Sequence, residues 1–169
     1  AIGENINLAS RMEGLNKHLG TRVLATGETV GPLDGHLDMR MLGHFRLKGF
    51  EKTVAVHELL GPIEEADRTR HWRETFAEGL KHFQNKDLAQ ARAAFERTLE
   101  LHPEDGPSYF YIGLMTEMLP EFMPDDWAGE VSIREKWIPA PSPVGRRCLQ
   151  VGPEHAFDLL QVIVADGHG

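Results

Sequence analysis

One apolar stripe with helical spacing runs through the first twenty residues. Its members recur at intervals of four, three and four residues, so they fall on one face of a helix. They are Leu8, Met12, Leu15 and Leu19. Asn5 or Asn7 is placed to cap the start of this helix, and Gly20 stands where a left-handed residue usually ends one. The pattern therefore predicts a helix over most of residues 1–20.

Short strands are expected next. Residues 22–25 read as a strand, and residues 26–30 read as a turn that opens a short helix. Partial alternation over residues 37–47 and an apolar run over 53–59 predict a hairpin, joined by a polar turn with glycine.

These elements predict an α+β unit over residues 1–60, in which the hairpin packs beside the first helix. Three short strands make a thin core for about 60 residues. We therefore expect further sheet partners, from the chain upstream or from another subunit.

The pattern changes to a purely helical one after Gly61-Pro62. Residues 61–71 are charged and predict a linker, and residues 72–119 predict an all-α helix-turn-helix unit. Its first stripe comprises Trp72, Phe76, Leu80 and Phe83. A second helix is expected from Asp87 or Leu88 to about Leu101, because Pro103 stops it. Residues 120–138 predict an irregular tail, and residues 139–169 a proline-rich linker with an unassigned C-terminus.

Composition narrows the classes of function. The net charge of -8 argues against nucleic acid as a partner, because neutralising phosphates needs a basic surface. No apolar run approaches the roughly 20 residues of a membrane span. The nine histidines and the single cysteine show no spacing typical of a metal site. The first residue is alanine, so we expect a processed, trimmed or partial chain.

Three segments resemble one enzyme family in order and spacing. Residues 2–13, IGENINLASRME, are similar to the "IGxxVNxAxRxE" segment of class III adenylate and guanylate cyclase domains. Residues 21–24 resemble the strand that follows it. Residues 47–49 and 54–59 resemble the closing "LKG…VxVYEL" hairpin. The resemblance covers residues 1–60 and implies a partial, ferredoxin-like cyclase unit.

The resemblance also implies site residues and a reaction. In the family, two catalytic domains pair and convert ATP or GTP to a cyclic nucleotide and pyrophosphate. Asn7 matches the asparagine that orients the ribose, Arg11 matches the arginine that stabilises the α-phosphoryl transition state, and Lys48 matches a lysine that contacts the triphosphate. Mg²⁺ or Mn²⁺ is held by two aspartates upstream of the matching segment, so no metal ligand of this kind is expected in this chain. We therefore expect a half-site that needs a second cyclase domain, in a cytoplasmic protein or the cytosolic end of a membrane-anchored one.

The residues alone leave plainer interpretations open. Asn7 and Arg11 are four apart, so they lie one above the other on the flank of the helix stripe. On that spacing alone, Asn7 is a helix cap and Arg11 a solvated charge. Lys48, in a hairpin turn, is by default a solvated lysine.

The helical unit resembles a tetratricopeptide repeat. Gly79, Ala91, Phe95 and Pro103 occupy the small, small, aromatic and proline positions of its 34-residue pattern. A second repeat keeps only its first helix, which is fewer than the three repeats that usually make a stable array. We expect a capping element or dimer contact rather than a peptide groove. The alternative to a cyclase fragment is a non-catalytic interaction module or scaffold that binds a protein partner, and a third reading is an inert fragment.

The tail after the helices allows two interpretations. Its "PxDWxG" run around Trp127 is similar to a short tail found after such repeats in some bacterial membrane-anchored cyclases. It is also consistent with a loop that Trp127 pins to the helices.

Overall fold

The computed structural model describes residues 2–133 and 149–150 of the chain. Its first element is helix α1, Ile2–Leu19, so Asn5 and Asn7 lie inside the helix and the prediction that one of them caps its start is wrong. Met12, Leu15 and Leu19 are buried, as the stripe predicts. Gly20 ends the helix with a φ of 65°, and its N–H donates to the carbonyl of Asn16 at 2.9 Å. This is the left-handed terminus that glycine adopts without strain.

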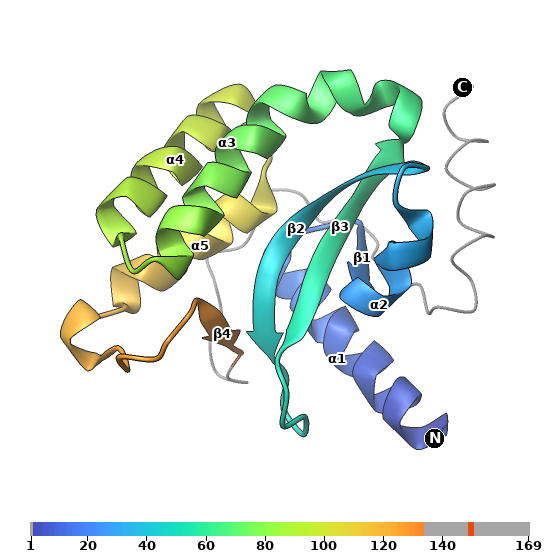
Figure 1. Cartoon of the computed structure of the whole chain (residues 1–169), viewed down its shortest axis with the longest axis horizontal. Helices are drawn as coiled ribbons and strands as arrows, with labels where there is room; N and C mark the ends of the chain where they lie inside the picture. Colours follow the sequence, from blue (N-terminus) through green and yellow to red (C-terminus); the bar gives the residue numbers. More distant parts are fainter. Residues whose placement is uncertain (1, 134–148, 151–169) are drawn as a thin grey trace.

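A mixed five-stranded sheet lies against α1 (Figure 1), and its strand order is β4-β2-β3-β1-β5. The strands are β1 Val23–Thr26, β2 Leu37–Arg46, β3 Val54–Pro62, β4 Glu130–Ser132 and β5 Leu149–Gln150. The central pairs β2–β3 and β1–β3 are antiparallel, whereas the edge pairs β4–β2 and β5–β1 are parallel. The short helix α2, Gly27–Val30, and a 3-10 turn, Gly31–Leu33, follow β1. The α+β class is thus confirmed.

Three helices follow β3 and pack beside the sheet (Figure 1). They are α3 Ala66–Gln84, α4 Leu88–Leu101 and α5 Gly106–Glu117. The side chain of Asp87 caps α4 by accepting from the N–H of Gln90. Asp105 caps α5 in the same way through Ser108. Both caps satisfy amide groups that a helix start otherwise leaves unpaired.

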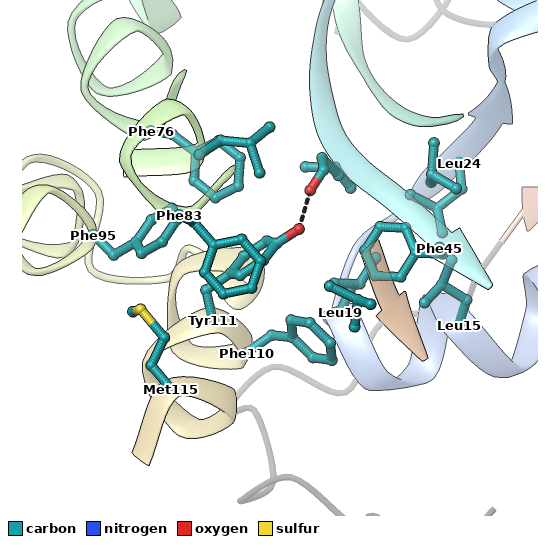
Figure 2. Close-up of a cluster of buried hydrophobic side chains, with 14 of the residues drawn as sticks. Leu15, Leu19, Leu24, Phe45, Phe76, Phe83, Phe95, Phe110, Tyr111 and Met115 are labelled. Atoms are coloured by element: carbon teal, nitrogen blue, oxygen red, sulfur yellow. Dashed lines mark hydrogen bonds between the residues drawn. The ribbon is translucent and has the colours of Figure 1, made fainter. Parts of the chain in front are cut away.

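One hydrophobic core joins the helices to the sheet. Figure 2 shows aromatic side chains of α3, α4 and α5 beside leucines of α1 and Phe45 of β2. Phe76, Phe83, Phe95, Phe110 and Tyr111 are almost completely buried. Because Phe45 and Phe110 meet at 6.1 Å between ring centroids, the apolar faces of the two parts of the chain cover each other.

A buried ionic cluster adds a polar tie across the same junction. The Arg40 guanidinium of β2 pairs with Glu58 of β3 and with Asp105 at the start of α5. Its carbon lies 4.6 Å from the ring centre of Trp72 and 4.5 Å from that of Phe76, both on α3. Four elements therefore meet at one arginine, which suits its planar, delocalised charge.

The structure differs from the expectation for residues 61–71. This range contains the end of β3, a 3-10 turn at Ile63–Glu65 and the start of α3. Thr69 donates to the buried carboxylate of Asp38 at 2.5 Å, and Arg73 Nε lies 3.1 Å from the same carboxylate. These ties to β2 order a segment whose charged composition alone indicates a linker.

The tail also differs from the expectation of an irregular segment. Residues 120–122 form a 3-10 turn, and residues 130–132 form β4. Together with β5, β4 supplies sheet partners from within the chain, where we expected them from upstream or from another subunit. The proline-rich stretch of residues 139–143 and the apolar run of residues 156–165 lie outside the described residues.

Candidate functional site

A groove of about 840 Å³ opens between α1, the start of α2 and the turn that joins β2 to β3. Its size falls in the range usual for small-molecule sites. Three of its lining side chains carry positive charge, namely Arg11, Lys48 and Lys52. Two carry negative charge, Glu28 and Glu51. In a chain whose net charge is -8, a locally cationic groove favours an anionic ligand.

Arg11 reaches the groove from the middle of α1, where its side chain is exposed. The next residue, Met12, is buried and fixes the rotation of the helix against the core. Asn7 belongs to the same helix, one turn earlier, so the predicted i and i+4 relationship holds along the backbone. The side chain of Asn7 lies outside the described residues.

Lys48 reaches the same groove from the hairpin turn after β2. The turn is closed by a 3.1 Å hydrogen bond from the N–H of Phe50 to the carbonyl of Leu47. Gly49 has a φ of 89°, a left-handed conformation that favours glycine. The glycine therefore permits the tight turn that presents Lys48. The fold brings Lys48 and Arg11 to one groove although they lie far apart in the sequence.

A smaller cavity of about 220 Å³ is also lined by these two residues. Arg11 and Lys48 line it together with His18 of α1 and Ile133 of the tail. Burial lowers the pKa of His18 below its ordinary value of 6.5. Sequence reasoning missed Ile133, because nothing in the local pattern of the tail indicates that it returns to α1.

The lining of the groove does not suit a metal ion. Within residues 2–133 and 149–150, no group of three or more histidine, cysteine, aspartate or glutamate side chains is placed to hold one. The groove sets its two carboxylates among three cationic side chains, which repel the divalent ion that carboxylate oxygens would otherwise attract.

Two curated proteins are similar to parts of the chain. Adenylate cyclase 1 of Rhizobium meliloti (strain 1021) is 36% identical over 69 residues, which is 41% of this chain and 10% of that protein. The terminal-differentiation specific adenylate cyclase of Dictyostelium discoideum is 26% identical over 117 residues, which is 66% of this chain and 6% of that protein. The matches thus span a tenth or less of the relatives' length. They show that the chain contains a region related to adenylate cyclases.

No family model and no solved structure matches the chain. Among the described helices, none combines the length and the apolar character that crossing a bilayer requires.

Proposed function

We propose that this chain supplies one half of the active site of a class III nucleotide cyclase, which converts ATP or GTP to a cyclic nucleotide and pyrophosphate. The observation that carries the proposal is the meeting of Arg11 and Lys48 in one cationic groove. The similarity to two adenylate cyclases supports it.

In this proposal, Arg11 stabilises the charge on the oxygens of the α-phosphoryl group. In the reaction, the ribose 3′-hydroxyl gives up its proton to water and attacks the α-phosphorus. The bond from the α-phosphorus to the oxygen that bridges it to the β-phosphorus breaks, and pyrophosphate leaves. In the transition state, the negative charge is redistributed over the phosphoryl oxygens. A guanidinium held in place donates several hydrogen bonds to these oxygens without reorganising. Arg11 is exposed in the groove and is therefore accessible to such a group.

Lys48 and Asn7 position the nucleotide. The Lys48 ammonium is a compact charge suited to the β- and γ-phosphates of the triphosphate. Asn7, one helical turn before Arg11, holds the ribose. In the family, the metal-binding aspartates come from the catalytic domain that faces the asparagine and the arginine, so in this proposal a second cyclase domain completes the site. The chain alone is therefore inactive in this proposal.

Mixing experiments test the proposal. The purified chain is incubated with ATP and Mn²⁺, alone and together with a cyclase domain whose own transition-state arginine has been removed. Cyclic AMP formed only in the mixture supports the proposal, provided that Arg11→Ala abolishes it. Arg68→Ala is the matched control, since Arg68 is an exposed arginine of α3 that pairs only with Glu65 at the surface among the contacts described. The absence of product from the wild-type mixture, or equal product with Arg11→Ala, contradicts the proposal.

We further propose that α3, α4 and α5 are one and a half tetratricopeptide-like repeats. A Cβ added at Gly79 of α3 would lie 2.8 Å from the Phe95 ring of α4, so the small residue permits the close approach that the pattern requires. The non-catalytic interaction module is not favoured, because both similar proteins are cyclases. The buried faces of these helices are also already covered by the sheet.

A further inference from the structure

Residues 124–133, which lie within the tail that follows the helices, begin on the helical unit. We call this segment the tail strap. Its first contact is with Lys86, in the turn between α3 and α4, whose ammonium donates to the carbonyls of Pro124 and Asp125 at 2.8 Å each. Lys86 itself has a φ of 65°, which is unusual for a residue with a side chain. The turn is thus shaped so that one lysine holds two carbonyls of the strap.

A second pair of contacts fixes the middle of the tail strap. The Trp127 ring packs edge-on against Phe83 of α3 at 5.1 Å between centroids, and its Nε1–H donates to the Glu130 carbonyl at 3.0 Å. Gly129 has a φ of 94° and lies on Gln84, where an added Cβ would approach the Gln84 Cγ to 2.6 Å. The strap therefore follows the C-terminal end of α3 closely.

The far end of the tail strap reaches the candidate site. Residues 130–132, as β4, pair with the last residues of β2, and the pair Arg46–Ser132 comes just before the Lys48 turn. Val131 is 2% exposed in the shared core. Ile133 then lines the small cavity beside Arg11 and Lys48. In Figure 1, β4 runs beside β2 on the side where the helices stand.

We propose that the tail strap is a positioning element that links the α3–α4 turn to Arg11 and Lys48. Ile133 is a positioning residue in this proposal, because it lines the cavity beside both cations and does not line the groove itself. A change in the helices, such as the binding of a partner, would move the strap and with it the end of β2. Placement errors of about 1 Å cost up to roughly 100-fold in rate, so a small movement suffices for regulation. The inference rests on the proposed function for its catalytic consequence only.

Hydrogen exchange tests the mechanical part without any activity. Gly129→Ala inserts a Cβ against Gln84 and forces the strap away from α3. Gly35→Ala is the matched control, since Gly35 has a φ of 79° but open space around its Cα. We expect Gly129→Ala to speed amide exchange by at least about tenfold in residues 44–50 as well as in the strap, and Gly35→Ala to leave both unchanged. Faster exchange confined to residues 124–133 overturns the inference.

Ile133 variants test the catalytic part in the mixed assay. Ile133→Ala should lower kcat about tenfold while the melting temperature changes little, because Ile133 is only half-buried. Ile133→Val should restore most of the rate. An unchanged kcat in Ile133→Ala, or a loss explained by unfolding, overturns the inference. If the wild-type mixture makes no product, the proposed function fails, and the exchange result still decides whether the strap couples the two regions.

Discussion

The hydroxyl of Tyr111, on α5, donates a 2.6 Å hydrogen bond to the main-chain carbonyl of Leu42, on β2. Both groups are buried, and Figure 2 shows the bond crossing from the helices to the sheet. It falls at an irregularity of the β2–β3 pairing between Met41 and Gly43. Gly43 has a φ of 135°, and a Cβ there would collide with the Tyr111 hydroxyl. Burial raises the pKa of Tyr111, so the hydroxyl remains a donor.

Removing this hydroxyl should destabilise the protein. Tyr111→Phe leaves the Leu42 carbonyl buried without its partner, which should cost about 1–3 kcal/mol in the free energy of unfolding. Tyr109→Phe is the control, because the Tyr109 hydroxyl donates at an exposed position to Pro103. Urea unfolding measures both variants. Equal losses for the two tyrosines would show that the bond between α5 and β2 carries no particular weight.

Replacing Arg40 should cost more. Arg40→Met leaves the carboxylates of Glu58 and Asp105 buried without their cation, a change worth about 3–5 kcal/mol. The exposed pair of Arg97 and Glu78, at 2.9 Å, offers the control Arg97→Met, which should cost about 1 kcal/mol or less. Chemical denaturation of both variants near neutral pH makes the comparison. A loss in Arg40→Met as small as in Arg97→Met would contradict the role assigned to the cluster.

The cost of Arg40→Met should also depend on pH. Burial, the largest cause, raises the pKa of Glu58 above its ordinary value of 4.5; the charge of Arg40 opposes this, and Asp105 adds to it. A raised folded pKa means that the contribution of Glu58 to stability is present below pH 4.5 and is lost as pH rises through the folded value. Without Arg40 that pKa rises further. The penalty of Arg40→Met should therefore be larger at about pH 8 than at about pH 4.5, and a penalty independent of pH would refute this reasoning.

Gly106, where the start of α5 meets the end of α1, should not tolerate a side chain. Gly106 begins α5, and a Cβ there would overlap the carbonyl oxygen of Leu19 at the end of α1. Because the obstacle is backbone, Gly106→Ala should destabilise by about 3 kcal/mol or more. Gly31→Ala, at a position with open space and an ordinary φ of -49°, should change stability by no more than about 1 kcal/mol. Thermal and urea unfolding measure both, and a tolerated Gly106→Ala would show that α1 and α5 do not meet in this way.

Lowering the pH should reduce the free energy of unfolding, because His57 then takes up a proton. Burial, and then the charge of His44, lower the pKa of His57 below its ordinary value of 6.5, and its Nδ1 is buried without a hydrogen-bond partner. A lowered folded pKa means stability that is present above pH 6.5 and lost as pH falls. His57→Gln should therefore reduce the loss of unfolding free energy between about pH 7.5 and pH 5.5. The exposed His36→Gln should retain the wild-type loss, and identical profiles for all three proteins would exclude His57 as the cause.

The helices and the hairpin could be predicted from local pattern. The stripe from Leu8 to Leu19 has the period of a helix buried on one side, and Gly20 marks its end. The tail could not be predicted in the same way. β4 has three residues and acquires its conformation from the free edge of β2, a contact made far along the chain. Local propensity carries no information about such a partner.

Two residues of the groove could be predicted from the sequence, whereas the buried ionic cluster around Arg40 could not. Arg11 and Lys48 were indicated by motif resemblance, and the fold brings them to one groove. Arg40 was not indicated, because two irregularities in β2 shift the alternation that would show which way it faces. Its partner Asp105 also lies beyond two helices in the sequence.

The central claim is that Arg11 stabilises charge at the reacting phosphorus. Steady-state kinetics of the mixed cyclase, with ATP varied, test it most directly. Arg11→Ala should lower kcat roughly 100-fold or more with little change in KM, because the interaction is strongest in the transition state. Lys48→Ala should mainly raise KM, since it contacts the triphosphate throughout. An Arg11→Ala mixture that retains the wild-type kcat, as the Arg68→Ala mixture should, would contradict the account.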